Sequence, residues 1–230
     1  MSITFLIPSY NSTKSIEETV KEISNAVLKK KNIEYEILIV DDCSPDDSFG
    51  LIKKLSEKYQ GIRFYQNSQN LGFCKNFLKG IDLSTKEFLM FIPSGNVINS
   101  LQIIKIINAI DKNDMVIVNY SNQLESREIS RVIISKLFTW AINIFFINKI
   151  KYFNGTNVYK TELLRKIKIF SNSFIFQSEL ILKMIMLTNQ YRSCSVTLKN
   201  IKKKNTSFFI ITNIKKNFID FIKLVIRKII

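Results

Sequence analysis

The sequence of 230 residues contains no histidine. Histidine is the side chain whose ordinary pKa falls near neutrality, and its imidazole is the commonest metal ligand in proteins. Its absence excludes histidine-based general catalysis, a histidine nucleophile and every metal site that needs a histidine ligand. The chain must therefore work with carboxylates, hydroxyls, thiols, amides and cationic side chains.

Cysteine is scarce as well, with Cys43, Cys74 and Cys194 as its three copies. They show no close pairing and no spacing typical of a metal site. An odd, sparse set argues for a reducing compartment, and against a disulfide framework or a zinc site.

Long apolar runs are also missing. No window reaches 18 uninterrupted apolar residues, so a simple membrane-spanning helix is not expected. The first residues, M-S-I-T-F-L-I-P, lack a basic region before their short apolar run, so we predict no signal peptide. With 46% apolar residues and neither an internal repeat nor a low-complexity linker, the chain suits one sizeable domain, or one domain plus an appendage.

Acidic residues are outnumbered, at 19 against 34 Lys and Arg, which gives a formal net charge of +15. Such a charge favours polyanionic partners, namely nucleotide phosphates, nucleic acid or an anionic membrane. The chain is also rich in Ile, Lys and Asn, and composition alone is an equally good source of the excess.

Short apolar strands alternate with amphipathic segments along the first half of the chain. The predicted strands are Ile3–Ile7, Tyr35–Val40, Ile62–Gln66, Glu87–Ile92 and Met115–Tyr120. Helices are predicted between them, the first opened by a capping box of Ser15 and Glu18. This order predicts an α/β fold with a mostly parallel sheet and helices on both faces.

Two adjacent carboxylates, Asp41 and Asp42, end the second strand and start the turn D-D-C-S-P-D. The carboxyl ends of parallel strands are where open α/β sheets bind ligands. The simpler interpretation is a solvated turn that caps the next helix, a role we also expect for Asp46 and Ser48.

Several motifs occur together in order: P-S-Y-N at 8–11, V-D-D-C-S-P-D at 40–46, N-L-G at 70–72, I-P-S-G-N at 92–96, and later Y-F-N-G-T-N-V-Y and F-Q-S-E. Together they resemble the inverting family 2 glycosyltransferases of Rossmann-like GT-A fold over roughly residues 1–190. The likeness is closer to the branch that includes polyprenyl-phosphate sugar synthases.

The resemblance implies a nucleotide-sugar site at these motifs. Pro8, Ser9 and Tyr10 match the loop that wraps the base, and Asp41 matches the acid that hydrogen-bonds it, which suits the N–H donors of uracil and guanine. Asp42 lies toward the ribose and phosphates and is also predicted as a catalytic residue. Further nucleotide-binding positions are Asn70, Gly72, Lys75, Ser94, Gly95 and Asn96. Lys75 is predicted to meet a phosphate, although a solvated lysine is an equally good interpretation.

The sequence departs from the family at the loop 93–96. The family holds Mg²⁺ or Mn²⁺ with an Asp where this chain has Gly95, which leaves Asp42 and Asn96 as the predicted metal ligands. Amide and hydroxyl oxygens are poor substitutes for a carboxylate. The other route is neutralisation of the diphosphate by cations, for which the candidates are Arg127, Arg131 and Lys202–Lys204.

Glu179, in F-Q-S-E, matches a family segment whose acid faces the acceptor. Burial among apolar residues would raise its pKa and make it the general base. The alternative is that Glu179 pairs with a basic residue. A polyprenyl-phosphate acceptor would need no base, because its oxygen is already anionic.

Two segments, Ser130–Ile150 and Asn217–Ile230, are predicted interfacial helices, apolar on one side and edged with Lys and Arg. From Arg192 onward the chain has ten basic residues and one acid, Asp220. We assign 1–205 to the GT-A domain, including 130–150, and 206–230 to a membrane- or partner-binding helix. The alternative is that these faces pack on the core or on a second subunit, as in a homo-oligomer.

The sequence thus predicts a bacterial glycosyltransferase that is cytoplasmic and peripheral on the inner face of the cell membrane. Its partners would be a nucleotide-sugar, a polyprenyl-phosphate or glycan acceptor and anionic lipid. The second hypothesis is a non-catalytic GT-A domain that supports a partner enzyme, because Gly95 replaces the metal-binding Asp. Nucleic acid is not expected, since the cations cluster beside apolar helices and not with exposed aromatics.

Overall fold

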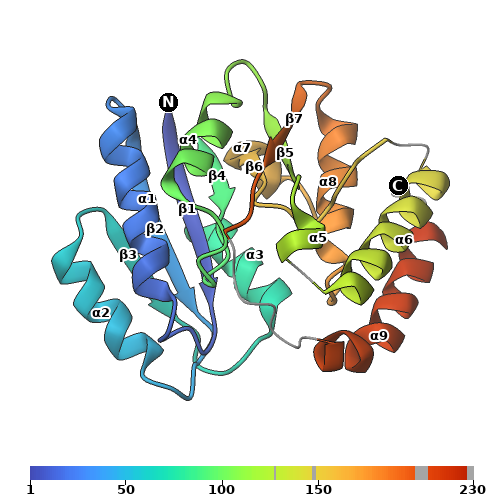
Figure 1. The fold of residues 1–230 in the computed structure, drawn as a ribbon, viewed down its shortest axis with the longest axis horizontal. Coiled ribbons are helices and arrows are strands. Elements are labelled where there is room, and N and C mark those ends of the chain that lie inside the picture. The colour runs from blue at the N-terminus through green and yellow to red at the C-terminus, as the bar shows by residue number, and fades with distance from the viewer. Residues whose placement is uncertain (127, 147–148, 200–206, 227–230) are drawn as a thin grey trace.

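The apolar runs assemble into one seven-stranded sheet in the computed structural model, which describes residues 1–126, 128–146, 149–199 and 207–226. The strand order is β3-β2-β1-β4-β6-β5-β7 (Figure 1). β6 pairs antiparallel with both β4 and β5, and the other described strand pairs are parallel. The predicted α/β class with a mostly parallel sheet is confirmed.

The strands are β1 (Ser2–Ser9), β2 (Glu34–Asp41), β3 (Ile62–Gln66), β4 (Phe88–Phe91), β5 (Met115–Tyr120), β6 (Val158–Lys160) and β7 (Tyr191–Val196). The helices are α1 (Ile16–Lys30), α2 (Ser48–Lys58), α3 (Phe73–Leu83), α4 (Ser100–Asn108), α5 (Gln123–Ser126), α6 (Ile129–Phe146), α7 (Thr161–Arg165), α8 (Phe176–Leu187) and α9 (Ser207–Ile226). The five predicted strands are confirmed, whereas β6, β7 and α5 were not predicted.

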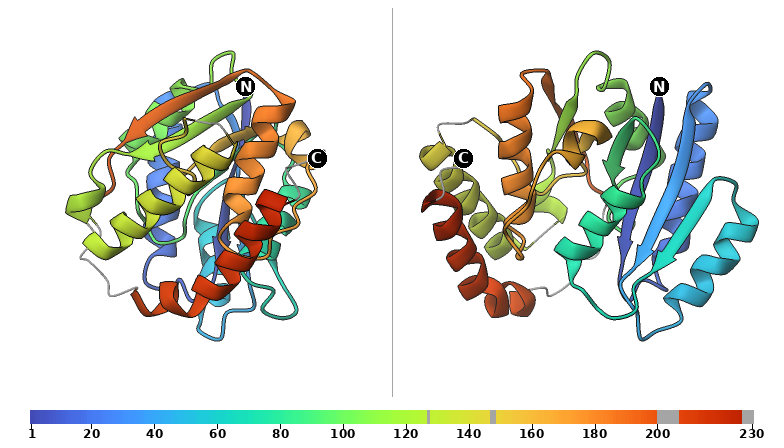
Figure 2. Two further views of the ribbon diagram at one scale, coloured as in Figure 1. Left: turned by 90° about the vertical axis from the view of Figure 1, so that its right-hand side faces the viewer. Right: turned by 180° about the vertical axis from the view of Figure 1, so that it is seen from behind.

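The sheet carries a core on each face because its central strands are apolar in both directions. On β1, Phe5 and its neighbours at alternate positions pack with α1, α2 and α4, whereas Leu6 points to the face covered by α3, α7 and α8. α6 and α9 complete the second face, where Ile142 and Leu224 are buried (Figure 2).

Two local predictions are wrong. Ser15 precedes α1 but makes no side-chain capping bond, so the capping box is not formed. The N-L-G motif suits a turn with unusual φ at Asn70 and Gly72; Gly72 has φ of +81°, whereas Asn70 is not among the residues with positive φ. α9, Ser207–Ile226, lies within the segment 206–230 that was predicted as the C-terminal helix.

Candidate functional site

Four loops meet at the edge of the sheet where β1, β2, β3 and β4 end, which is the lower edge in Figure 1. We call the loops 8–12, 41–48, 67–72 and 93–96 the carboxyl edge. Ser9 is paired with Asp41 in the sheet register, and Asp41 with Gln66 of β3. The Ile92 N–H donates to the Leu6 carbonyl (2.9 Å), which brings the exit of β4 beside β1. The motifs predicted to form one site therefore lie together.

Asp41 is fully buried, and its carboxylate accepts hydrogen bonds from neighbouring residues of the protein. Its two oxygens accept from the Ser44 N–H (3.0 Å), the Ser44 hydroxyl (2.6 Å) and the Gln66 side-chain amide (3.2 Å). An ionised carboxylate has about four acceptor positions, so one is left for a ligand. Asp41 thus shapes the turn, and its contact with a base stays a prediction.

Asp42 is buried beside Asp41 and organises the loop 67–72. One oxygen accepts from the Asn67 side-chain amide and the Leu71 N–H, and the other accepts from the Gly72 N–H, all at 2.8 Å. Asn67 also donates to Asn76, which in turn donates to the Val40 carbonyl. This closed network explains the adjacent acids structurally, and the catalytic and metal roles of Asp42 stay predictions.

The predicted base-wrapping loop presents one exposed aromatic ring. Pro8 and Ser9 are buried, whereas the Tyr10 side chain is 49% exposed. The Asn11 N–H donates to the Ser44 hydroxyl (3.0 Å), which ties this loop to the turn after Asp41. Tyr10 is thus held on a fixed backbone at the carboxyl edge, with its ring available for stacking.

The N-cap of α2 is Asp47, which makes no side-chain capping bond, so Asp46 and Ser48 do not hold the cap position predicted for them. The Asp46 carboxylate accepts from the Ser48 N–H (3.1 Å) and from the Thr13 hydroxyl (2.9 Å). The Ser48 hydroxyl accepts from the Ser12 N–H (2.8 Å). These bonds fasten the start of α2 to the loop 8–12, so Asp46 and Ser48 support the site from behind.

At the loop after β3, the two exposed predicted residues are Asn70 and Lys75. The Asn70 side-chain oxygen accepts from the Gly72 N–H (3.1 Å), and Lys75 lies on the first turn of α3. Their contact with a nucleotide stays a prediction.

The loop after β4 is held by α1. The Thr19 hydroxyl donates to the Ser94 carbonyl (3.0 Å) and accepts from the Asn96 N–H (3.0 Å). Gly95 is exposed, and a β carbon there would meet only Val97, at 3.9 Å. The Asn96 side-chain oxygen accepts from the ammonium of Lys199 (2.9 Å), a residue that the sequence analysis did not single out.

Glu179 does not have the electrostatics predicted for a general base. It is buried in α8, where it accepts from the Phe170 N–H (3.0 Å), the Ser171 N–H (2.9 Å) and Lys183 (2.7 Å). Burial alone raises the pKa, but the bonds from Lys183, Ser171 and Phe170 outweigh it and hold the pKa below its ordinary value. The predicted raised pKa is wrong, and the alternative pairing with a basic residue is confirmed.

The glycosyl transferase family 2 profile matches residues 4–174, well over half of the chain. This chain belongs to glycosyl transferase family 2. The match covers all four loops of the carboxyl edge and ends before α8, so it includes every predicted nucleotide-binding residue and leaves out Glu179.

Two proteins of known name have sequences similar to part of this family 2 chain. The poly(ribitol-phosphate) beta-glucosyltransferase of Bacillus spizizenii is 31% identical over 103 residues, covering 44% of this chain and 16% of that protein. The dolichol-phosphate mannosyltransferase of Pyrococcus furiosus is 31% identical over 80 residues, covering 35% of this chain and 22% of that protein. The matched part of the chain spans under a quarter of the length of either relative.

Among solved structures, the glucosyl-3-phosphoglycerate synthase of Mycobacterium tuberculosis, in complex with Mn²⁺, uridine diphosphate and glucosyl-3-phosphoglycerate, superposes with a TM-score of 0.69. It is 15% identical, and the match covers 92% of this chain and 76% of that one. At this identity the likeness concerns the fold, and it confirms the predicted GT-A fold of the family 2 chain.

The side chains of this family 2 chain fit a divalent metal poorly. Among the described residues, no three Asp, Glu or Cys side chains gather into a group that could hold one. The remaining positions, 127, 147–148, 200–206 and 227–230, contain no Asp, Glu, His or Cys. The loop 67–72 takes three of the about four acceptor positions of Asp42, and the Asn96 oxygen is bound to an ammonium. Mg²⁺ and Mn²⁺ prefer carboxylate oxygens, which are not offered here.

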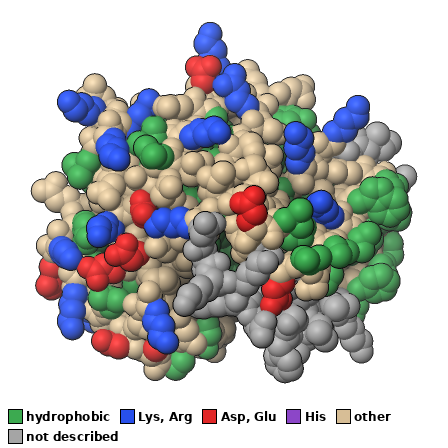
Figure 3. Space-filling view, in the orientation of Figure 1, with side chains coloured by type: hydrophobic (Ala, Val, Ile, Leu, Met, Phe, Trp, Pro, Cys, Tyr) green, Lys and Arg blue, Asp and Glu red, His purple; other side chains and the backbone are tan. Residues whose placement is uncertain are grey.

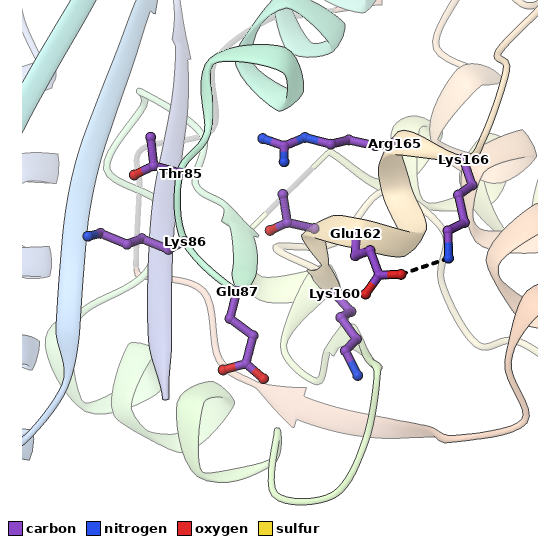
Figure 4. A pocket seen from close by; sticks show the side chains of 8 residues that line it. Thr85, Lys86, Glu87, Lys160, Glu162, Arg165 and Lys166 are labelled. Atoms are coloured by element: carbon purple, nitrogen blue, oxygen red, sulfur yellow. Dashed lines mark hydrogen bonds and ion pairs between the residues drawn. The ribbon is translucent and has the colours of Figure 1, made fainter.

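A cavity of about 510 Å³ lies at the opposite edge of the sheet, where β4 begins and β6 ends (Figure 4). It is lined by Thr85, Lys86, Glu87, Lys160, Thr161, Glu162, Arg165 and Lys166. Three of its lysines have carboxylate partners: Glu34 for Lys86, Asp114 for Lys160 and Glu162 for Lys166. These pairings account for most of its positive charge, so we place the functional site at the carboxyl edge.

The cationic candidates for the diphosphate fall mostly beyond what the structure describes. Arg127, Lys202, Lys203 and Lys204 lie outside the described residues, as does the side chain of Arg131. Among the described residues, Lys199 is a cation that binds a loop of the carboxyl edge directly, through Asn96. Its signal in the sequence was weak, because it lies 103 residues from Asn96.

Proposed function

We propose that this chain transfers a sugar from a nucleotide-sugar to a lipid-linked or polysaccharide acceptor at a membrane surface. The observation that carries the proposal is the carboxyl edge, where the exposed Tyr10 ring and the buried Asp41 carboxylate sit on adjacent, register-paired strands. Membership of family 2 and the glycosyltransferase activities named for its relatives support it.

The nucleotide binds across the carboxyl edge in this proposal. Tyr10 stacks on the base, and Asp41 uses its remaining acceptor position for a base N–H. The loops that hold Ser94 and Gly72 have their backbones fixed by Thr19 and Asp42, so they meet the ribose and diphosphate without reordering. Pre-ordered loops lower the entropic cost of binding.

The reaction is a displacement at the anomeric carbon of the sugar. An acceptor oxygen forms the new bond as the bond to the nucleoside diphosphate breaks, and the configuration inverts. The main demand on the protein is to stabilise the charge that develops on the leaving diphosphate. An anionic phosphate acceptor needs no base, which agrees with a chain that lacks histidine and whose Glu179 is held ionised by Lys183.

The acceptor side of the proposal rests on an apolar surface. We use this name for the exposed apolar residues of α6, which are Ile129, Ile133, Ile134, Leu137, Trp140, Ile144 and Phe145 (Figure 3). α9 adds exposed Phe218, Ile219, Ile222 and Ile226. No helix within the described residues has both the length and the apolar character that crossing a bilayer demands.

Cations accompany this apolar surface. Lys136 lies on α6, Lys149 follows it, and Lys216 and Lys223 lie on α9, all exposed. Apolar side chains with flanking lysines suit a helix lying in the interface of an anionic membrane, where each cation adds about 1 kcal/mol. A peripheral position on the inner face of the cell membrane would present a lipid-linked acceptor to the carboxyl edge.

The test is nucleotide binding and turnover by the purified chain. We expect Tyr10→Ala to weaken uridine or guanosine diphosphate binding about tenfold, because base stacking contributes about 1–3 kcal/mol. Tyr191→Ala is the matched control, since Tyr191 is 40% exposed but begins β7, away from the carboxyl edge. Equal effects of the two substitutions, or no binding to the unsubstituted chain, would refute the proposal.

A second function is favoured by Gly95 alone. A family 2 domain without a metal-binding acid would bind a nucleotide-sugar or lipid and support a partner enzyme without turning the sugar over. One measurement distinguishes the two functions. It follows the release of nucleoside diphosphate from UDP- and GDP-sugars, with and without an acceptor extract. Binding without release favours the second function.

A further inference from the structure

The loop 93–96 holds a cation of the chain's own, the Lys199 ammonium. The Lys199 ammonium lies 2.9 Å from the Asn96 side-chain oxygen and 2.5 Å from one Glu22 oxygen. An amide oxygen and a carboxylate oxygen are ligands that suit a divalent cation. Here the Lys199 ammonium donates a hydrogen bond to each of these two oxygens.

The position of Lys199 is set by its backbone and does not depend on the flexible side chain alone. The Lys199 N–H donates to the Val97 carbonyl (2.9 Å), directly after the loop 93–96. The preceding Leu198 is held on both sides by Asn122, whose amide donates to its carbonyl and accepts from its N–H. The strand exit after β7 is thereby fastened to the exit of β4.

Glu22 does not cancel the lysine charge by itself. Its second oxygen accepts from the N–H of Ser100 (2.7 Å), and Ser100 is the first residue of α4. The carboxylate therefore also lies at the positive N-terminal end of a helix dipole. Burial opposes ionisation of Glu22, but the bonds from Lys199 and Ser100 keep its pKa below the ordinary value. The local balance of one ammonium, one carboxylate and one helix N-terminus is positive.

Lys199 also has bonding capacity left. An ammonium carries three N–H donors, and the contacts to Glu22 and Asn96 use two. The side chain is partly exposed, at 27%, so a ligand can reach its ammonium. A phosphate oxygen at the carboxyl edge would therefore meet a charged donor without displacing either protein partner.

We propose that Lys199 is the cation that neutralises the sugar-donor diphosphate, so that this chain binds its nucleotide without a divalent metal. The inference rests on the proposed function and names the group that stabilises the leaving diphosphate. When the sugar is transferred, the diphosphate leaves with both electrons of the broken bond. The negative charge that develops on it is then compensated by the fixed Lys199 ammonium, without a metal ion.

The experiment measures binding of uridine and guanosine mono- and diphosphates to the full chain, in EDTA and in MnCl₂. We expect diphosphate affinity to change less than about twofold between the two buffers. Lys199→Met should weaken diphosphate binding about tenfold while monophosphate binding changes less, because a charge-assisted bond to phosphate is lost. Lys54→Met, an exposed lysine of α2, controls for loss of one positive charge.

Glu22→Gln separates a ligand-binding lysine from a merely structural ion pair. It keeps the shape of Glu22 and frees Lys199, so diphosphate affinity should hold or tighten. A purely structural pair would instead make Lys199→Met and Glu22→Gln lower the urea midpoint alike, with the diphosphate-to-monophosphate ratio unchanged, and that result overturns the inference.

Diphosphate binding only in MnCl₂ also overturns the inference and leaves the proposed function standing. No nucleotide binding in either buffer refutes the proposed function itself, so the two failures are distinguishable.

Discussion

The carboxyl edge and the apolar surface of α6 differ in how their side chains are placed relative to water. At the carboxyl edge, the Asp41 and Asp42 carboxylates are buried and each accepts from several donors, as Asp42 does from Asn67, Leu71 and Gly72. On α6, large apolar side chains such as Trp140 remain in water, at 65% exposure. The polar groups of the carboxyl edge are thus paired within the chain, whereas the apolar side chains of α6 are left facing water.

The largest effect should come from breaking the carboxyl edge at Asp42. Asp42→Ala removes the acceptor shared by the Asn67 amide and the Leu71 and Gly72 N–H groups, and we expect a loss of about 3 kcal/mol in the free energy of unfolding. Asn67 and Gly72 keep one acceptor each, in Asn76 and Asn70, whereas the Leu71 N–H loses its acceptor. Urea denaturation measures the loss in free energy. Asp82→Ala, at an exposed position of α3, should stay within about 0.5 kcal/mol of the unsubstituted chain. A similarly small change for Asp42→Ala would show that its network is not needed.

The apolar surface should respond in binding and not in stability. Leu137→Asp with Trp140→Asp removes two exposed apolar groups, which contribute about 2 kcal/mol to burial in a lipid interface. We expect co-sedimentation with vesicles containing phosphatidylglycerol to fall at least tenfold, with the urea midpoint unchanged. Leu28→Asp, at a 75% exposed position of α1, is the control. Unchanged vesicle binding in the double variant would argue that α6 faces a protein partner.

Glu179 lies between the two regions and should give a pH-dependent effect. Its folded-state pKa is below the ordinary 4.5, so its contribution to stability is present above that pH and is lost as pH falls through the folded pKa. Glu179→Gln should cost about 2 kcal/mol at pH 7, since three donors including Lys183 lose a charged acceptor. The difference from the unsubstituted chain should shrink below pH 4.5, as followed by urea unfolding across pH. A difference that grows in acid would mean a raised pKa, as a general base requires.

The smallest change in stability is expected at Gly95. Its φ is not in the left-handed region, and an added β carbon meets only Val97, so Gly95→Asp should fold within about 0.5 kcal/mol of the original chain. The new carboxylate would stand next in sequence to Asn96, the partner of Lys199, and would repel a diphosphate at this loop. For Gly95→Asp we expect the diphosphate affinity in EDTA to fall a few-fold and MnCl₂ to restore part of the loss. For Gly95→Ala we expect the affinity of the unsubstituted chain in both buffers.

The sequence predicts the first region better than the second, and for a physical reason. Strands such as β1 and β2 are buried on both faces, so continuous apolar runs bounded by Pro and Asp mark them clearly. β6 has three residues, and β7 reads Y-R-S-C-S-V with exposed polar positions, so neither resembles a buried strand before its partners are known.

Side-chain pairing shows the same limit. The spacing of Glu179 and Lys183, four residues apart on one helix, was a readable signal for an ion pair. Nothing in the sequence connects Lys199 with Asn96 and Glu22, or shows that Asp42 accepts three hydrogen bonds from the loop 67–72. Motifs locate the carboxyl edge, but only the fold shows which of its polar groups remain free for a ligand.

The short strand β6 has a consequence for how the chain is assembled. β5 and β7 join the sheet only through Val158–Lys160, which are made long after β1 to β4. A growing chain can therefore pair β1, β2, β3 and β4 early, while β5 must wait without a neighbouring strand until β6 leaves the ribosome. During that interval the apolar edge of β4 is open, and it is the point where a stalled or truncated chain is most exposed to aggregation.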